Sequence, residues 1–456
     1  MRIILDIPLT IKEVSWATGG AVSGYLGSES ISAISTDTRE LIPGDLFIAL
    51  CGERYDGNDF CDAAAGMGAF VLCERDFSPA ITVKSTADAL LRLAKYYKTL
   101  LPHLFCTLGI TGSCGKTTTK EFLRKMCERK YTVHATEGNH NNTVGLPITI
   151  LSAKRQTEIL ICELGTNNKG EIKKLSECLM PDVGIITNIG SAHIGRFGSR
   201  EAIAKEKSEI ASSGCSYVIC KGDEPLLFNI KNRVPAFVDT DGDFSLTTKQ
   251  IEINSSVIDL NIMGKTIEDV KTPINAKHLL EALIYSVAFC SLIGFSDEEI
   301  VNAISDIKPE DMRHKLIKVS NFYILDDSYN ASYESILAAF EQLKLYNNAK
   351  SALIGDVLEL GDKSETIHEN IGKAAARTGL KNLYLYGENA LTVKRGATKA
   401  GMPENKIFVN SGVGNTALTT AQILENKEDD EIILFKASHR LNLKKIINEL
   451  KEKAND

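Results

Sequence analysis

The stretch "GITGSCGKTTTKEF" (109–122) decides the fold of this chain of 456 residues. It continues an apolar run, "LFCTLGIT" (104–111), that is typical of a buried strand, and it leads into a helical pattern. A strand, a glycine turn, Lys-Thr and a helix form a phosphate-binding loop, because backbone N–H groups and the helix N-terminus attract anionic oxygens. The strict spacing G-x-x-x-x-G-K-[ST] would place glycine where Ile110 stands, so the pattern here is T-G-x-x-G-K-T, from Thr111 to Thr117.

The side chains of this loop predict a nucleotide site. Lys116 is expected to reach the β- and γ-phosphates, and the Thr117 hydroxyl is expected to ligate Mg²⁺. The alternative is a chance glycine turn before a helix, and the buried strand directly before the turn argues against it. The loop residues expected to bind ATP are Thr111, Gly112, Ser113, Cys114, Gly115, Lys116, Thr117 and Thr118.

Further apolar runs follow the loop at 157–165, 182–190 and 216–223, with helical patterns between them. Continuous apolar strands that alternate with helices predict a parallel sheet covered on both faces. Two helical patterns, at 275–295 and 296–307, close this block. The second opens with Ser296 followed three residues later by Glu299, which is the spacing of a capping box.

The sequence predicts an α/β protein of three domains. Short β-rich pieces and one long helical pattern precede the loop, and five more apolar strands, mostly separated by helical patterns, follow Pro309. The expected domains are a small α/β domain that binds a uridine nucleotide, a central P-loop domain with a parallel sheet, and a Rossmann-like C-terminal domain. Their expected ranges are 1–102, 103–309 and 310–456.

Composition narrows the function. The formal net charge of −7 and the lack of a basic stripe argue against a nucleic-acid binder. No apolar run is long enough to cross a bilayer, and the N-terminus does not read as a signal peptide. The eleven cysteines form no CxxC motif, so we expect free thiols in a reducing cytoplasm.

At "TGSCGKTT" the chain resembles the ATP loop of the Mur ligases and the folylpolyglutamate synthetases. The resemblance extends through "STDTRELIPGDLFIAL" (35–50), "EGNHNNTVGLP" (137–147), "NIGSAHIGRFGS" (188–199), "LDDSYNAS" (325–332) and "IGDVLELG" (354–361). It is strongest for the Mur ligases that join D-Ala-D-Ala to UDP-MurNAc-tripeptide. The resemblance implies an ATP-dependent, ADP-forming ligase of peptidoglycan precursor synthesis, acting as a cytoplasmic monomer through an acyl phosphate.

The catalytic residues implied by the resemblance include two metal ligands after strand ends. Glu163 closes a buried strand, where a carboxylate can hold Mg²⁺ through oxygen. His193 follows another strand end and is expected to bind a second Mg²⁺, although imidazole is an unusual ligand for so hard a cation. Lys207 is expected to carry a carbamate, against the alternative of a solvated lysine in a charged helix, and Arg313 is expected to reach the phosphates.

The resemblance also assigns polar loop residues to the substrates, and ordinary turn chemistry is the alternative for each of them. The nucleotide contacts implied outside the loop are Asn188, Asp327, Tyr329 and Asn330. The implied UDP-substrate contacts are Ser35, Thr38, Arg39, Asn139, Asn141, Asn142, Thr143 and Thr166.

Four positions depart from the family pattern. The family usually has glycine where this chain has Met312, and histidine where it has Lys277. It usually has an asparagine that helps to hold adenine where this chain has Glu281, and arginine where it has His439. The last three leave open a paralogue with the same chemistry on another acid and amine, such as a folyl or tetrapyrrole acid. A P-loop switch without ligation is the alternative from another class. The third residue of the peptide, meso-diaminopimelate or L-lysine, also stays open.

Overall fold

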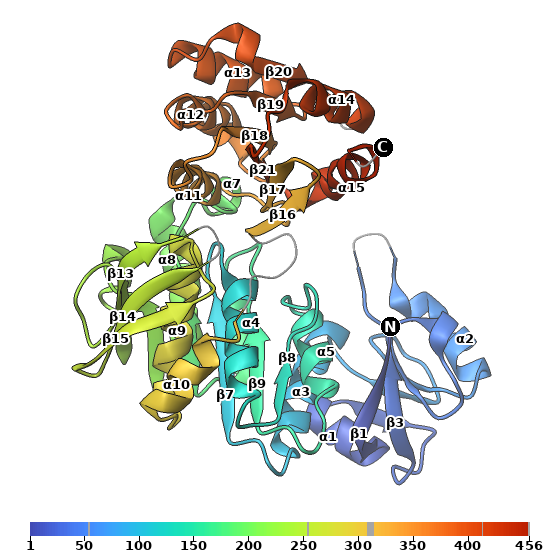
Figure 1. The fold of residues 1–456 in the computed structure, drawn as a ribbon. Coiled ribbons are helices and arrows are strands. Elements are labelled where there is room, and N and C mark those ends of the chain that lie inside the picture. Colours follow the sequence, from blue (N-terminus) through green and yellow to red (C-terminus); the bar gives the residue numbers. More distant parts are fainter. Residues whose placement is uncertain (53–54, 253–254, 308–313, 413, 455–456) are drawn as a thin grey trace.

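The computed structural model describes residues 1–52, 55–252, 255–307, 314–412 and 414–454. These residues form three separate β-sheets, each accompanied by helices, that follow one another along the chain (Figure 1). The expected three-part α/β architecture is therefore confirmed. The C-terminal unit lies over one end of the central unit, and the N-terminal unit lies beside the central unit (Figure 1).

The N-terminal unit is built on six strands in the order β1-β3-β4-β5-β6-β2, with β1 and β2 antiparallel to their neighbours. Its strands are β1 (Arg2–Thr10), β2 (Ala21–Ser23), β3 (Ser30–Ser35), β4 (Leu46–Ile48), β5 (Phe70–Cys73) and β6 (Ala80–Thr82). Its helices are α1 (Ile11–Thr18), α2 (Cys61–Gly66) and α3 (Thr86–Thr99). The apolar stripe of α3 also packs on central helices α5 (Gly145–Leu151) and α6 (Glu171–Leu179), which ties the two units together.

The central sheet has nine strands in the order β15-β14-β13-β12-β11-β10-β7-β9-β8. Neighbours from β8 to β13 are parallel, and β14 and β15 are antiparallel. Four of these strands confirm the predicted apolar runs, namely β7 (Cys106–Thr111), β9 (Ile159–Glu163), β10 (Val183–Ile186) and β11 (Tyr217–Lys221). The strands that were not predicted are β8 (Val133–Ala135), β12 (Arg233–Val238), β13 (Phe244–Ile251), β14 (Ser256–Ile262) and β15 (Lys265–Thr272).

Helices cover both faces of the central sheet. On one face, α4 (Lys116–Cys127), α9 (Lys277–Leu292) and α10 (Asp297–Ile304) share an apolar core with the strands. Helix α9 is buried on nearly all sides, as an almost wholly apolar helix must be. The predicted capping box of Ser296 and Glu299 is present at the start of α10. The other face carries α5, α6, α7 (Ile194–Phe197) and α8 (Arg200–Ser208).

The C-terminal sheet has the order β16-β17-β21-β18-β19-β20. The five predicted strands are confirmed as β17 (Phe322–Asp326), β18 (Lys350–Gly355), β19 (Leu383–Tyr386), β20 (Ile407–Asn410) and β21 (Ile432–Lys436), and their pairings with one another are parallel. An unpredicted antiparallel strand, β16 (Lys315–Val319), adds an edge. The helices are α11 (Tyr333–Lys344), α12 (Ser364–Ala376), α13 (Ala390–Lys399), α14 (Thr416–Asn426) and α15 (Lys444–Lys453). The domain boundaries at residues 102 and 309 stay predictions.

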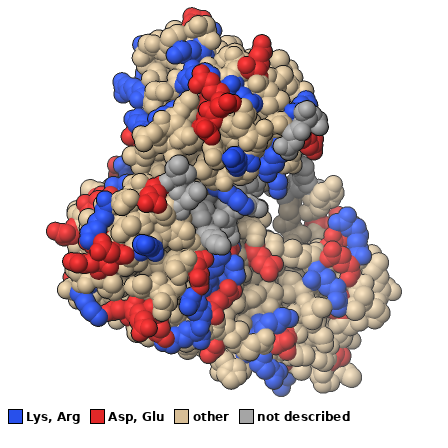
Figure 2. Space-filling model, viewed as in Figure 1, with Lys and Arg blue, Asp and Glu red and all other residues tan. Residues whose placement is uncertain are grey.

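The surface charges and the state of the cysteines match what the amino-acid composition predicts. Basic and acidic side chains are interspersed on the face shown in Figure 2. All eleven cysteines are free, and nine of them are buried. Within the described part of the chain, every helix is too short or too polar to span a bilayer.

Helices α12 and α13 cross at two glycines, and this contact allows a test of the fold. A Cβ atom on Gly372 would lie 2.0 Å from the Val393 carbonyl oxygen. We therefore expect Gly372→Ala to lower the free energy of unfolding of the C-terminal unit by about 1–3 kcal/mol, as overpacking does. Urea titration followed by circular dichroism measures the change. Gly66→Ala is the control because a Cβ atom there would meet no described atom within 4 Å, and equal midpoints for the two variants would contradict the prediction.

Candidate active site

A cleft of about 1560 Å³ separates the central and C-terminal units. Its walls come from the glycine loop after β7, from the carboxyl ends of β9, β10 and β11, and from the loops after β17 and β18. The strands that end here are parallel, so their final residues all meet at one edge of the sheet. The cleft therefore gathers polar side chains that are far apart in the sequence.

The turn between β7 and α4 depends on two glycines. Gly112 has φ 149°, and a Cβ atom there would lie 1.8 Å from Oγ1 of Thr187. Gly115 has φ 80° and forms the N-cap of α4. Any larger residue at 112 would collide with the end of the neighbouring strand, so glycine is required for this close approach.

Asn188 holds the loop in shape from the adjacent strand. Its Oδ1 accepts a hydrogen bond from the Cys114 backbone N–H at 3.1 Å, and its Nδ2 donates to the Cys114 carbonyl at 3.1 Å. The Thr187 hydroxyl donates to the same carbonyl at 2.6 Å, and Nζ of Lys116 donates to the Gly112 carbonyl at 2.7 Å. Asn188 therefore braces the loop, and because it also lines the cleft, its expected contact with ATP stays a prediction.

Glu163 ends β9 as predicted, and the residue is 1% exposed. Its backbone N–H donates to the Thr136 hydroxyl at 3.0 Å. Its Oε1 atom is buried without a hydrogen-bond partner among the described residues. A buried carboxylate oxygen without a hydrogen bond destabilises the fold unless a cation or a hydrogen-bond donor binds it. Oε1 of Glu163 therefore suits the role of a metal ligand.

His193 lies at the same edge, at the N-cap of α7, with φ 60°. Its Nδ1 lies 2.5 Å from Oε2 of Glu359, which comes from the loop after β18. Burial lowers the pKa of His193, and the Glu359 carboxylate opposes that shift. Nearby, Glu334 of α11 accepts hydrogen bonds from the Ser191 backbone N–H at 2.7 Å and the Ser191 hydroxyl at 3.0 Å. Two carboxylates of the C-terminal unit thus reach the loop beside the phosphate-binding turn.

Lys207 is 3% exposed in α8. The solvated lysine considered as an alternative is therefore wrong. Burial lowers the pKa of its ammonium well below the ordinary value, and the nearby Lys116 lowers it further. This environment therefore disfavours the charged form of Lys207.

The loop after β17 joins the cleft through its polar residues. Nζ of Lys436 contacts Oδ2 of Asp327 at 2.5 Å. Burial would raise the pKa of Asp327, but Lys436 together with His278 and His314 outweighs burial, and the pKa is lowered. Oδ1 of Asn330 accepts from the His439 backbone N–H at 3.2 Å, and the rings of Tyr329 and His439 lie 5.5 Å apart. His439, which replaces the arginine that is usual in the family, thus contacts the loop after β17.

The predicted substrate contacts divide into two groups. The residues that line the cleft are Asn139, Asn141, Asn142, Thr143 and Thr166. Two of them also make turn contacts, since Oδ1 of Asn142 accepts from the Gly145 N–H at 2.8 Å and the Thr166 hydroxyl donates to the Asn168 carbonyl at 2.8 Å.

The N-terminal candidates lie apart from this cleft. Ser35, Thr38 and Arg39 belong to the N-terminal unit and are outside the described lining of the cleft. Exposed Arg39 pairs with Asp37 at 2.5 Å. The structure therefore does not bring these residues to the phosphate loop. Arg313 and Met312 lie outside the described residues.

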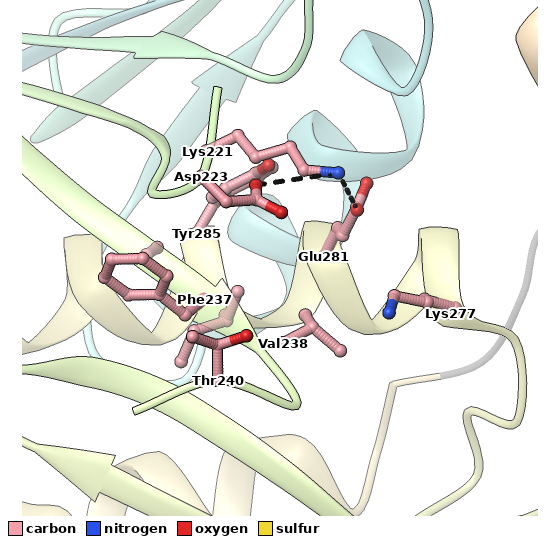
Figure 3. A pocket seen from close by; sticks show the side chains of 10 residues that line it. Lys221, Asp223, Phe237, Val238, Thr240, Lys277, Glu281 and Tyr285 are labelled. Carbon is pink, nitrogen blue, oxygen red and sulfur yellow. Dashed lines mark hydrogen bonds and ion pairs between the residues drawn. The ribbon is translucent and has the colours of Figure 1, made fainter. Parts of the chain in front are cut away.

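Two departures from the family pattern line a small pocket in the central unit (Figure 3). Oε1 of Glu281 contacts Nζ of Lys221 at 2.8 Å, and Nζ of Lys277 lies 3.7 Å from Oδ2 of Asp239. The Tyr285 hydroxyl donates to the Thr187 carbonyl at 2.8 Å, which joins this pocket to the strand that walls the phosphate loop. Glu281 and Lys277 also line the large cleft, so both departures from the family pattern lie at the candidate active site.

Comparison with known proteins agrees with this geometry. The family model of the Mur ligase middle domain matches residues 110–290, and that of the Mur ligase glutamate ligase domain matches residues 312–439. The chain is 35% identical to the UDP-N-acetylmuramoyl-tripeptide–D-alanyl-D-alanine ligase of Bacillus subtilis (strain 168), over 98% of this chain and 99% of that one. The chain belongs to the Mur ligase family.

Two solved structures extend the likeness to the whole Mur ligase fold. MurF from Acinetobacter baumannii superposes with a TM-score of 0.88 at 28% identity, covering 99% of this chain and 100% of that chain. MurF ligase from Thermotoga maritima in complex with ADP superposes with a TM-score of 0.80 at 26% identity, covering 92% and 97%. The predicted family resemblance is confirmed.

Several charged residues in the cleft or behind it escaped the sequence analysis. Glu334, Glu359 and Lys120 carry charges that reach the site, yet each lies in an ordinary helix or loop pattern. Lys120 lies in the quoted stretch "GITGSCGKTTTKEF" and Glu359 in "IGDVLELG", but neither stretch indicated the role of these side chains. Their partners belong to other elements, so no spacing along the chain could reveal the contacts.

The bracing role of Asn188 predicts a binding defect. Asn188→Ala removes the two hydrogen bonds to the Cys114 backbone, and we expect ADP to bind about 30-fold more weakly, because hydrogen bonds of this kind contribute about 1 kcal/mol each. Isothermal titration calorimetry measures the dissociation constant. Asn167→Ala, at another asparagine of the cleft, is the control, and unchanged affinity in Asn188→Ala would refute the bracing role.

Proposed function

We propose that this chain is an ATP-dependent ligase that joins D-Ala-D-Ala to UDP-MurNAc-tripeptide and forms ADP, in peptidoglycan precursor synthesis. The observation that carries the proposal is a phosphate-binding loop that opens onto a cleft closed by a second α/β unit. The full-length likeness to ligases named for this reaction supports the choice of substrates. The substrates also support a cytoplasmic location.

The nucleotide would bind with its phosphates against the N-terminus of α4. Backbone N–H groups from Gly112 to Thr118, together with the ammonium of Lys116, would hold the phosphate oxygens. Asp327, Tyr329 and Asn330 line the facing wall, and we assign them to the nucleoside side of ATP. Arg313 keeps its expected role at the phosphates as part of this proposal.

The polar residues of the cleft fit Mg²⁺. Oε1 of Glu163, which has no hydrogen-bond partner among the described residues, and the Thr117 hydroxyl offer oxygen ligands, and His193 offers a ring nitrogen for a second ion. When bound, Mg²⁺ neutralises charge on the phosphate oxygens. The residues around it orient the substrates and exclude water.

The chemistry that suits this cleft is acyl transfer through a phosphorylated intermediate. The tripeptide carboxylate attacks the γ-phosphorus of ATP, and the bond from that phosphorus to the bridging oxygen breaks. The products of this step are ADP and an acyl phosphate on the tripeptide. The amine of D-Ala-D-Ala then attacks the acyl carbon, and phosphate departs from the tetrahedral intermediate. Lys116 stabilises negative charge on the transferred group. The contacts of Glu334 and Glu359 with the central unit hold the two walls together around the reactants.

The UDP-sugar would extend from this cleft toward the N-terminal unit. The asparagine loop of 139–142, Thr143 and Thr166 would hold its sugars or phosphates, and Ser35, Thr38 and Arg39 would hold its uridine end. A paralogue that uses another acid and amine is the second candidate, because Glu281, Lys277 and His439 depart from the family pattern at cleft positions. We also propose that the enzyme acts as a monomer of 49.8 kDa, which light scattering would measure.

The choice of amine is the direct test of the proposed reaction. With ATP and UDP-MurNAc-tripeptide present, we expect phosphate release with D-Ala-D-Ala and less than about one hundredth of that rate with single amino acids, because the acyl phosphate needs the correctly held amine. Tripeptides with meso-diaminopimelate and with L-lysine are assayed in parallel. Faster turnover with L-Lys or L-Glu as the amine would favour the paralogue, and ATP turnover that needs neither acid nor amine would favour a switch protein.

We propose further that Lys207 carries a carbamate in the active enzyme. Its burial and the nearby Lys116 favour a neutral amine, which can take up CO₂ and so become an anion. An anion there would supply negative charge beside the phosphate site. This modification rests on the local electrostatics and on the family resemblance at "KSEI" (207–210).

Replacement of Lys207 separates the carbamate from a packing role. We expect Lys207→Ala to lose at least about 100-fold in kcat and to recover part of it when a short carboxylic acid is added, since the acid replaces the missing anion. Lys205→Ala, on the same helix, should be near normal. Loss of activity without any rescue would count against the carbamate. So would an intact mass, measured under native conditions with bicarbonate, that lacks the increment of about 44 Da for one bound CO₂.

A further inference from the structure

Behind the phosphate loop lies a buried ionic cluster, and Glu163 is its only member with a direct role in the proposed reaction. It consists of Lys120 and Glu121 on α4, Thr136 after β8, and Glu163 at the end of β9. Lys120 is 3% exposed and Glu163 is 1% exposed. A buried lysine costs stability unless its charge is compensated, so its position requires a reason.

Lys120 contacts three oxygen atoms from three elements. Its Nζ donates to the Thr136 carbonyl at 2.7 Å and lies 2.6 Å from Oε1 of Glu121. Its distance to Oε1 of Glu163 is 3.9 Å, which is within the range of an ion pair and beyond that of a hydrogen bond. Lys120 therefore attracts the Glu163 carboxylate and leaves the oxygen free to bind something else.

The same residues also fix the backbone of Glu163. The Thr136 hydroxyl accepts from the Glu163 N–H, while the Thr136 carbonyl accepts from Lys120. Lys120 follows Lys116 by one helical turn, so both cations come from one rigid helix. Lys116 lies at the glycine turn, and Lys120 lies beside the Glu163 carboxylate.

Compensation of Glu121 alone does not explain Lys120. Arg124, one turn further along α4, already contacts Oε2 of Glu121 at 2.9 Å. The other charged partner of Lys120 is Glu163, whose Oε1 has no hydrogen bond among the described residues. Lys120 is thus placed to serve that carboxylate.

We propose that Lys120 is a positioning residue for the reaction: it orients the Glu163 carboxylate and offsets its charge, so that Oε1 faces the cation of the nucleotide site. This inference rests on the proposed function, which assigns Glu163 to Mg²⁺. Side chains that orient a metal ligand without touching the metal commonly change metal affinity about 10–100-fold.

The test measures ADP binding by calorimetry with increasing Mg²⁺ and, separately, in EDTA. Lys120→Met keeps an unbranched side chain that is one atom shorter, and it removes the charge. We expect the Mg²⁺ concentration that gives half of the gain in ADP affinity to rise about 10-fold or more, while ADP binding in EDTA stays within about twofold. Lys120→Arg should restore part of the Mg²⁺ response.

Arg124→Met is the matched control, because Arg124 lies on the same helix as Lys120 and contacts the same Glu121. It should leave the Mg²⁺ response unchanged. If Lys120→Met does not fold, the double variant Lys120→Gln with Glu121→Gln removes equal and opposite charges and takes its place. Equal weakening of ADP binding with and without Mg²⁺, or the same Mg²⁺ shift in Arg124→Met, would overturn the inference.

Glu163→Gln separates this inference from the proposed function. If Glu163→Gln leaves the Mg²⁺ response unchanged, the assignment of Glu163 to the metal fails. If Glu163→Gln raises the Mg²⁺ requirement and Lys120→Met does not, only the role of Lys120 fails. In the Glu163→Gln background, Lys120→Met should add no further shift, because its partner is already gone.

Discussion

The close approach of the glycine turn to strand β10 is the constraint on which the rest of the site depends. Ile186 pairs with Thr111, so the residue that follows β10, Thr187, lies directly beside the turn. Only a residue without a Cβ atom fits at Gly112, and the Thr187 hydroxyl then reaches the Cys114 carbonyl. The shape of the phosphate loop is therefore set by a neighbouring strand as well as by its own glycines.

The parallel order of the central strands determines which residues share the cleft. Strands β7, β9, β10 and β11 end at one edge, so the chain that leaves each of them contributes to one wall. The C-terminal unit faces this edge and supplies carboxylates from α11 and from the loop after β18. The active site is thus formed by strand ends on one side and by a separate unit on the other.

Charge compensation is the second organising feature of the cleft. Lys116, Lys120 and Lys207 bring three basic side chains close to the phosphate loop from helices α4 and α8. They differ in environment: Lys120 has two carboxylates nearby, whereas Lys207 is buried close to Lys116. Because electrostatic interactions strengthen where water is excluded, these differences place the three charges in three different electrostatic environments.

The sequence by itself determined the strands of continuous apolar residues and the glycine turn. Strands buried on both faces need apolar residues at every position, so β7, β9, β10 and β11 could be predicted. Strands β13 and β15 were missed because much of their surface is exposed and polar.

Tertiary structure alone decided the burial of Lys207, the bracing by Asn188 and the contacts of Lys120, Glu334 and Glu359. Periodicity describes one element at a time, whereas these contacts join residues from different elements. Their geometry exists only after the sheet and the two facing units have packed.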